Sequence, residues 1–342
     1  MKKRSMAILS SIFLCLTLFL SGCGAGQASD TQPATGGEKG GTHKFKMSYT
    51  VQTSHVWHAA AEKFKEELAA RSNGRMTLDL YPASQLGPDK DMMAQLNAGS
   101  LDFAYIANAY MSGRSESLNG WFMPFLFPTL EDAAKARESE PAKEMLKELE
   151  QQGVIGLDYV FAGNRHVLVK EGTVQSPEDL KGKKLRTPAS PAILDFWNTL
   201  GTSPAPIPIS EVYTALQTGV IDGIDIDLDA LVSFKFYEIT KNLTLTNHIT
   251  YPGIMLMSKA TAGKLSSEDL QIVKDAAKVS TDWAVQEALN REQKLVEEAK
   301  ANGVNVLDLP NDHQFGTMKE EFYQKYGEKN PLIKAFIEAN KK

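Results

Sequence analysis

Apolar and polar residues follow two periodicities along the chain. Residues 45–51 are extended in character and residues 76–81 alternate as a strand, whereas residues 55–73 carry apolar side chains at helical spacing. The pattern continues with a helix predicted over residues 87–100 and an apolar strand over residues 101–107. This alternation of strands and helices predicts an α/β fold with mainly parallel sheets.

The middle of the chain continues the same alternation. Residues 130–151 have a helical pattern, and residues 153–160 and 166–170 are predicted to form two separate strands. Ser176 and Asp179 have the spacing of a capping box, which predicts a helical turn. The α/β pattern therefore extends into the second half of the chain.

A single long helix is predicted over residues 266–302. This segment contains neither Pro nor Gly, and its apolar residues keep a helical stripe. Ser266 with Asp269 favours a helix start, and Gly303 favours a stop. At the usual rise per residue, such a helix is about 54 Å long, which fits a helix that lies across two domains. The chain length of 342 residues also favours two lobes.

The N-terminus has the features of an export signal. The basic start MKKR precedes an apolar run over residues 7–20, which is too short to cross a bilayer comfortably. The sequence LSGC at residues 20–23 resembles a lipobox, in which cleavage leaves Cys23 as a lipidated first residue. We therefore expect residues 1–22 to be a lipoprotein signal peptide, with a plain secretory signal as the alternative.

Residues 23–42 are expected to form a flexible tether from the lipidated Cys23. This segment is rich in Gly, Ser, Thr and Gln and has almost nothing apolar to pack. The other cysteine, Cys15, lies in the segment that cleavage removes, so no internal disulfide is expected. The expected location is extracytoplasmic, with the protein lipid-anchored to the cell membrane at the cell surface or in a periplasm.

The sequence lacks the motifs of the common enzyme and metal-binding classes. It has no G-x-S-x-G, H-E-x-x-H, P-loop or G-x-G-x-x-G motif and no zinc spacing of Cys and His. His55 and His58 could serve a metal ion, although such a pair is more often one surface and one pocket histidine. A net charge of −5 argues against nucleic acid as a partner. We expect no catalysis, no cofactor and no metal ion.

Two arginines are candidates for binding a carboxylate. Arg165 lies just before one predicted strand and Arg186 at the end of another. Ligands of open α/β sheets bind beyond the carboxyl ends of strands, and arginine can hold a carboxylate with two parallel hydrogen bonds. A solvated surface arginine or a structural ion pair is the alternative for each residue.

Acidic residues alternate with apolar residues around position 226. If residues 224–228 are extended, Asp225 and Asp227 lie on the same face of the strand. Acids near a core are costly unless something pairs with them. One interpretation is that Asp225 and Asp227 face solvent or the N-terminus of a neighbouring helix. The other is that at least one of them faces a ligand cleft, and Asp227 is then the first candidate.

Three segments resemble the solute-binding proteins of tripartite ATP-independent periplasmic (TRAP) transporters. They are SPEDLKGKKLRTPAS (176–190), LGTSPAPIPISEVYTALQTGVIDG (200–223) and SNGRMTLDLYPASQLGPDKDMMAQLNAGSLDF (72–103). The resemblance implies two α/β lobes that close on an organic acid, a long helix across both lobes, and delivery of the ligand to the membrane subunits of the transporter.

The resemblance also implies lobe boundaries and site residues. The first lobe would contain residues 43–162 plus about 251–290, and the second residues 163–250 plus about 291–342. Arg186 matches the family arginine that forms the main salt bridge to the ligand carboxylate, and Arg165 matches a second arginine often found there. Further pocket positions are implied at Ile209, Asn108, Trp57 and His55.

One departure from the family pattern affects the ligand. Members that carry Asn at the position of Ile226 use it to help hold the carboxylate, so the ligand class cannot be copied. A facing Asp227 or Asp225 accepts hydrogen bonds from hydroxyl groups but repels a second carboxylate. A hydroxylated monocarboxylate such as a sugar acid or uronate is therefore favoured. The alternatives are a C4-dicarboxylate binder, a stand-alone ligand-sensing module of the same fold, and a secreted hydrolase or lyase.

Overall fold

The computed structural model describes residues 41–309, 315 and 318–341. The expected signal peptide, Cys23 and most of the expected tether lie outside the described residues. Residues Gly40–Lys342 form one compact unit.

Ten strands of the described residues form one mixed sheet in the order β2-β1-β3-β9-β4-β7-β5-β6, and β8 pairs with both β4 and β10. The strands are β1 (His43–Ser48), β2 (Met76–Tyr81), β3 (Phe103–Ala107), β4 (Val154–Val169), β5 (Lys184–Thr187), β6 (Ser203–Pro206), β7 (Gly223–Asp227), β8 (Asn242–Leu245), β9 (Thr250–Ser258) and β10 (Asn305–Asp308). Pairing is parallel among β2, β1 and β3 and among β7, β5 and β6, but antiparallel around β9 and β4. The expected parallel pairing therefore holds for the outer strands and not for the middle of the sheet.

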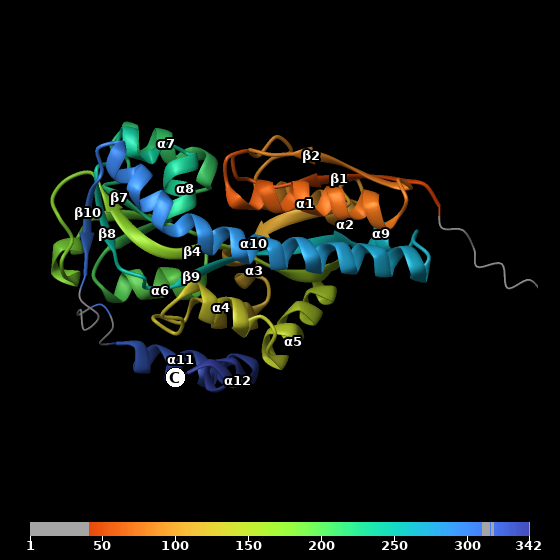
Figure 1. Ribbon diagram of the computed structural model, residues 1–342. Coiled ribbons are helices and arrows are strands. Elements are labelled where there is room, and N and C mark those ends of the chain that lie inside the picture. The colour runs from red at the N-terminus through yellow and green to blue at the C-terminus, as the bar shows by residue number, and fades with distance from the viewer. Residues whose placement is uncertain (1–40, 310–314, 316–317, 342) are drawn as a thin grey trace, which may run out of the picture. The chain divides into compact units, whose positions relative to one another are not determined.

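Helices cover the sheet on both sides, as Figure 1 shows. They are α1 (Val56–Arg71), α2 (Asp89–Ala98), α3 (Asn108–Ser112), α4 (Leu130–Ala136), α5 (Glu140–Glu148), α6 (Pro191–Thr199), α7 (Ile209–Gln217), α8 (Leu228–Ser233), α9 (Lys259–Ala262), α10 (Ser267–Ala301), α11 (Lys319–Lys329) and α12 (Pro331–Asn340). Short 3-10 helices are η1 (Glu116–Phe122), η2 (Leu149–Gln152), η3 (Pro177–Leu180) and η4 (Phe236–Glu238).

The strand β4 joins two lobes. It pairs with β9 up to Asn164 and with β7 from Arg165 onward. We call the part built on β2-β1-β3-β9 the first lobe and the part built on β7-β5-β6, β8 and β10 the second lobe. The sequence predicted two separate strands here, but the chain stays extended through an irregularity at Gly163, where φ is +129°. Glycine adopts that conformation without strain, so the strand bends instead of ending.

The long helix α10 is confirmed, and it packs on both lobes. Its N-cap Ser266 accepts a hydrogen bond from the backbone N–H of Asp269 at 3.1 Å. The helix packs against α1 and α4 of the first lobe and against α8 and β10 of the second (Figure 1). Many of its buried residues are alanines, which allow close approach of the neighbouring elements. Helices of the described residues are either too short or too polar to cross a membrane.

One predicted helix differs from the sequence-based expectation. The helix predicted over residues 130–151 is broken at Ser139, whose hydroxyl accepts from the N–H of Ala142 at 3.4 Å and so caps a new helix. The C-terminal helix α12 packs on η1 and α5 of the first lobe, and the tilted rings of Phe336 and Trp121 contact each other with centroids 4.8 Å apart. The expected division placed residues 291–342 in the second lobe. The lobe boundaries as a whole stay a prediction.

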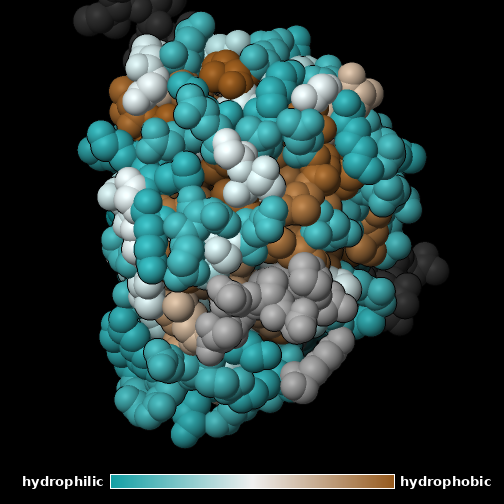
Figure 2. All heavy atoms as spheres, turned by 90° about the vertical axis from the view of Figure 1, so that its left-hand side faces the viewer, coloured by the Kyte–Doolittle hydropathy of each residue, from teal (hydrophilic) through white to brown (hydrophobic). Residues whose placement is uncertain are grey.

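The surface of the second lobe is mainly hydrophilic. Figure 2 shows the left-hand side of Figure 1, where hydrophilic residues cover most of the face and hydrophobic residues gather to the right of its centre. The apolar side chains are concentrated in two buried clusters, a large one and a smaller one confined to the second lobe and the end of α10. The polar side chains described next are therefore held by a packed framework.

Candidate functional site

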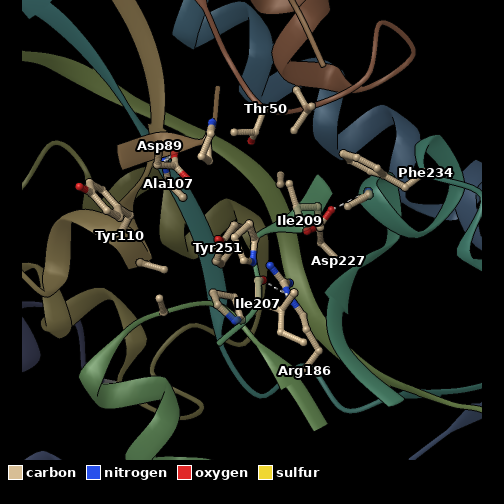
Figure 3. A pocket seen from close by; sticks show the side chains of 18 of the residues that line it. Thr50, Asp89, Ala107, Tyr110, Arg186, Ile207, Ile209, Asp227, Phe234 and Tyr251 are labelled. Atoms are coloured by element: carbon tan, nitrogen blue, oxygen red, sulfur yellow. Dashed lines mark hydrogen bonds between the residues drawn. The ribbon is translucent and has the colours of Figure 1, made fainter. Parts of the chain in front are cut away.

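A cavity of about 260 Å³ lies between the two lobes. Its wall combines the ends of β3, β5 and β7, the starts of the helices α1, α2 and α7, the middle of β4 and the start of β9. Its polar and aromatic lining residues are Thr50, His55, Trp57, Asp89, Lys90, Tyr110, Arg165, Arg186, Asp227, Phe234 and Tyr251. Figure 3 shows several of these side chains converging on the cavity.

Arg165 is surrounded by acceptors from β7. Its Nε donates to Asp225 at 2.6 Å, its Nη1 donates to Asp227 at 3.0 Å, and its Nη2 donates to the carbonyl of Asp225. The guanidinium also lies 4.3 Å from the centre of the Tyr251 ring. All of these side chains except that of Tyr251 are at most 2% exposed. Arg165 therefore forms a structural ion-pair cluster at one wall of the cavity.

The acidic residues of β7 owe their position to strand geometry. Ile224 and Ile226 belong to the hydrophobic cluster of the second lobe, so Asp225 and Asp227 lie on the opposite face of the strand. That face meets Arg165 on the neighbouring β4. Ile226, at the position where some family members carry Asn, is therefore buried on the far side of β7.

Asp225 is enclosed by donors. Trp197 Nε1 donates to it at 2.9 Å, and His248 Nε2 lies 3.4 Å from it. Burial acts to raise the pKa of Asp225, but Arg165, His248 and Trp197 outweigh burial and hold that pKa well below its usual value. In turn, Asp225 and Asp227 outweigh the effect of burial on Arg165 and raise its pKa. The cluster is therefore charged and mutually compensated.

Asp227 lines the cavity, but both of its oxygens already have partners. Oδ2 accepts from Arg165, and Oδ1 accepts from the N–H of Ala230 at 2.8 Å, which caps α8. His55 Nε2 lies 3.9 Å from Oδ1. Burial acts to raise the pKa of Asp227, but His55, Arg165 and the Ala230 N–H together lower it. Asp227 therefore contacts the N-terminus of α8 and also lines the cavity. The sequence analysis had treated these two environments as alternatives.

Arg186 has a different environment. Its Nε donates to the carbonyl of Ile207 at 2.9 Å, and within the described residues no carboxylate oxygen lies within 4.0 Å of its guanidinium. The side chain is 4% exposed and points toward the centre of the cavity in Figure 3. Burial and the neighbouring charge of Arg165 lower the pKa of Arg186 to about 10. At neutral pH this arginine is therefore a charged group that faces the cavity and has no ion-pair partner among the described residues.

The start of α1 brings two more predicted residues to the cavity. His55 is the N-cap, and its Nδ1 accepts from the N–H of Trp57 at 3.1 Å. Because Nδ1 accepts, the proton of a neutral His55 lies on Nε2, the nitrogen nearer Asp227. The Trp57 ring packs against Gly253 of β9, where an added Cβ would lie 2.5 Å from the ring. Gly253 therefore leaves room for this aromatic wall.

The remaining predicted residues divide between the cavity and the interior. Ile209, the first residue of α7, lines the cavity. Asn108 is fully buried at the start of α3, donates to the carbonyl of Leu118 at 3.1 Å, and is not part of the lining. Asp225 also lies behind the wall. Of the two histidines considered for a metal ion, His55 lines the cavity, whereas His58 is not part of the lining and its Nδ1 contacts Tyr49 Oη at 2.6 Å.

The sequence reasoning missed Asp89, which lines the cavity near Arg186. This half-buried residue begins α2, and its Oδ1 accepts from the N–H of Ala107 at 3.0 Å. Burial raises the pKa of Asp89 to about 6, although the Ala107 N–H and Arg186 act against that rise. In the sequence Asp89 looks like an ordinary acidic residue in the first turn of a helix. Only its raised pKa and its position at the cavity distinguish it from other such residues.

The sequence reasoning also missed three further lining residues, Tyr251, Tyr110 and Thr50. The sequence analysis assigned these residues no role, and the fold alone brings them to the cavity. Tyr110 Oη accepts from Arg114 Nη2 at 2.7 Å, so its ring is held in place at the cavity. Burial raises the pKa of Tyr251 to about 12, so its hydroxyl stays protonated at neutral pH.

Comparison with known proteins gives consistent results. The family model described as bacterial extracellular solute-binding protein, family 7, matches residues 47–330. The 2,3-diketo-L-gulonate-binding periplasmic protein of Escherichia coli is 31% identical over 77% of this chain and 80% of its own length. The sialic acid-binding periplasmic protein of Vibrio cholerae is 31% identical over 82% of this chain and 87% of its own.

Solved structures agree with the fold. A TRAP periplasmic solute-binding protein from Bordetella bronchispeptica, with density assigned to pantoate, has a TM-score of 0.82 at 29% identity and covers 86% of this chain and 98% of its own. One from Sulfitobacter with bound β-D-galacturonate has a TM-score of 0.81 at 26% identity, covering 86% and 99%. One from Shewanella oneidensis with bound succinate has a TM-score of 0.82 at 25% identity, covering 87% and 99%.

Members of this family bind substrates for transport and are not enzymes. With its two α/β lobes, a long helix across both and a cavity between them, this chain belongs to the bacterial extracellular solute-binding proteins of family 7 and is the substrate-binding protein of a TRAP transporter.

Proposed function

We propose that the chain captures a hydroxylated monocarboxylate, such as a sugar acid or uronate, and delivers it to TRAP membrane subunits. The observation that supports this is the contrast between two arginines. Arg165 is compensated by Asp225 and Asp227, whereas Arg186 is buried at the cavity with no acidic partner among the described residues. A buried charge is costly unless it is paired. Arg186 therefore offers one strong binding site for a single carboxylate.

The other polar groups of the cavity suit hydroxyl groups better than a second carboxylate. Asp89 and Asp227 accept hydrogen bonds but repel another carboxylate, and Thr50 and Tyr110 bring hydroxyl groups. Lys90 is the remaining cation of the lining, and it is exposed. A C4-dicarboxylate would have to use that exposed lysine for its second charge, where an ion pair is worth little.

The relatives are consistent with this ligand class and also keep the alternative open. Two of them are named for 2,3-diketo-L-gulonate and sialic acid, and one solved structure contains galacturonate, whereas another contains succinate. The family is known for such acids, and the choice among them depends on the cavity of this chain.

A calorimetric panel tests the ligand class. The purified protein is titrated with D-galacturonate, D-galactonate, D-erythronate and succinate at low salt. We expect at least one hydroxylated monoacid to bind ten or more times tighter than succinate. Tight succinate binding with no response to sugar acids would contradict the proposal and favour the dicarboxylate alternative. An Asp227→Asn variant in the same panel tests whether Asp227 takes part in ligand preference.

We also propose that the protein acts from a lipid anchor on Cys23 outside the cytoplasm. The support is the LSGC sequence at residues 20–23 and the polar segment that follows it. Incorporation of labelled palmitate by growing cells, with a Cys23→Ser variant as control, tests this. Label in the wild type that is lost from the variant is expected. Equal labelling, or none in either protein, would favour a plain secretory signal.

A further inference from the structure

Two segments that line the cavity from opposite lobes also meet outside it. In the first lobe, His55 and Trp57 line the cavity, and in the second lobe Asp227 and Ala230 do so. The residues between them are not part of the lining. The backbone N–H of Val56 donates to Asp229 Oδ2 at 3.1 Å across the lobes. The contact therefore lies directly behind the residues that face the cavity.

Arg291 of α10 completes this junction. Its Nη1 donates to the carbonyl of Ser54 in the first lobe at 2.9 Å and lies 3.5 Å from Asp229 Oδ2 in the second lobe. Its Nε donates to Glu287 on the same helix at 2.7 Å. One side chain of the long helix thus holds both lobes at once.

The position of Asp229 is explained by the helix start that it meets. Its side chain is 3% exposed, and the N–H groups at the start of α1 have no partners within the helix itself. A carboxylate there is favoured by the positive end of the helix dipole. Asp229 can make these contacts only while the second lobe is in place against the first, because Val56 and Ser54 belong to the other lobe.

We infer that Asp229 and Arg291 form a latch that holds the lobes closed over the ligand. Asp229 is a positioning residue: it acts through the backbone of Val56 on His55 and Trp57, and it does not contact the ligand. This inference depends on the proposed solute-binding function and on a ligand that fills the cavity. It does not depend on which acid that ligand is. Closure brings the latch together, so its loss acts on ligand release more than on capture.

Stopped-flow binding kinetics test the latch. The ligand is the acid that the wild type binds most tightly among D-galacturonate, D-galactonate, D-erythronate and succinate. Asp229→Ala removes the acceptor of the Val56 N–H, and we expect dissociation to become at least about tenfold faster, with association within about twofold of wild type. Asp229→Asn keeps an acceptor oxygen and should recover part of the loss. Arg291→Gln should also dissociate faster.

The matched control is Asp222→Ala. Asp222 is an aspartate of the second lobe whose Oδ2 accepts from the backbone N–H of Lys184 at 2.8 Å, within the same lobe and outside the cavity. We expect its dissociation rate to equal that of the wild type. A merely structural role of Asp229 would lower the melting temperature without changing the dissociation rate. If Asp229→Ala does not fold, Arg291→Gln decides, because that arginine is one-quarter exposed.

A second readout does not depend on ligand affinity. Spin labels at Lys65→Cys on α1 and Thr218→Cys after α7, in a chain carrying Cys23→Ser, report the distance between the lobes. We expect Asp229→Ala to move this distance distribution toward longer values. Dissociation within twofold of wild type in both Asp229→Ala and Arg291→Gln, with an unchanged distribution, would overturn the latch. Failure of every probe acid to bind would instead contradict the proposed ligand class, and the distance measurement would then decide on the latch alone.

Discussion

At the scale of residues, the two cavity arginines differ in what surrounds them, although both are buried and charged. Arg165 is compensated by Asp225 and Asp227, whereas Arg186 has only the carbonyl of Ile207. The first arrangement stabilises the fold, and the second costs stability until an anion binds. The same residue type therefore has opposite effects on the protein without ligand.

Arg186→Ala and Arg165→Ala should separate these effects. Arg186→Ala should weaken binding of the preferred acid at least about thirtyfold, because losing one partner of a buried charge pair costs about 2–5 kcal/mol. Its stability without ligand should be unchanged or higher. Arg165→Ala should lower the free energy of unfolding by about 3–5 kcal/mol, because two buried carboxylates lose their partner.

Calorimetry and chemical denaturation measure both quantities. Arg186→Lys should restore binding only in part, because lysine cannot make the two-pronged contact. Arg71→Ala, which removes an exposed arginine paired with Glu67 on α1, is the control and should change neither quantity. Binding by Arg186→Ala within threefold of wild type would contradict the assigned role.

Asp89 should make stability depend on pH. Its folded-state pKa of about 6 is above the usual 3.8, so the folded protein binds this proton more tightly than the unfolded chain. The stability contribution is present below pH 4 and is lost as pH rises through 6. Asp89→Asn, which stays neutral, should therefore be more stable than wild type at pH 7.5, on the order of 1–2 kcal/mol, and about equal at pH 4.

Thermal denaturation at the two pH values measures this difference. Asp91→Asn, on the exposed side of the same first turn of α2, is the control. An equal effect of Asp89→Asn at both pH values would contradict the raised pKa. If Asp89 also accepts a ligand hydroxyl, the same variant should bind the preferred acid more weakly while being more stable.

At the scale of elements, the cavity is shaped by how closely α1 approaches β9. Trp57 lies against Gly253, where no side chain intervenes. Two hydrogen bonds at the helix start, to His55 Nδ1 and to Asp229, hold this end of α1 in place. A single glycine on one element therefore decides where an aromatic wall on another element can stand.

Gly253→Ala should displace Trp57. A Cβ at this position would lie 2.5 Å from the indole ring, so the ring or the strand must shift. We expect stability to fall by about 1–3 kcal/mol, as is usual for overpacking, together with weaker ligand binding. Gly263→Ala, whose added Cβ would meet its neighbours no closer than 3.5 Å, is the control for thermal shift and calorimetry. Unchanged stability and binding in Gly253→Ala would show that the wall tolerates the shift.

At the scale of the whole molecule, the cavity takes residues from both lobes, and α10 packs on each. Closing the lobes on a ligand excludes water around Arg186, which strengthens its electrostatic contact. The strand β4 and the helix α10 are continuous between the lobes, so a movement must bend them and not separate them. Hinge closure of this kind is common among proteins that bind small ligands.

Ligand should make the protein more compact. Solution scattering with the preferred acid at saturation should show a smaller radius of gyration than without it, and circular dichroism should show that α10 stays helical. An unchanged scattering profile would contradict closure. The Asp222→Ala variant, outside the cavity and the latch, should behave as wild type.

The sequence by itself determined the local elements and the family. The periodicity of residues 266–302 and their start and stop signals were sufficient for α10, because helix formation depends on nearby residues. The motif around Arg186 carried the family resemblance, which the comparisons confirm. Strand-end position also placed Arg186 among the candidates, and the structure puts it at the cavity.

Only the tertiary structure decided which side chains meet. Strand pairing brought Arg165 opposite Asp225 and Asp227, which are sixty and more positions away in the chain, and so made it a compensated charge. Burial at the cavity, not sequence pattern, raised the pKa of Asp89. Contact across the lobes gave Asp229 its partner at Val56. A periodicity shows which face of a strand or helix is buried, but charge compensation and burial depend on residues that are distant in sequence.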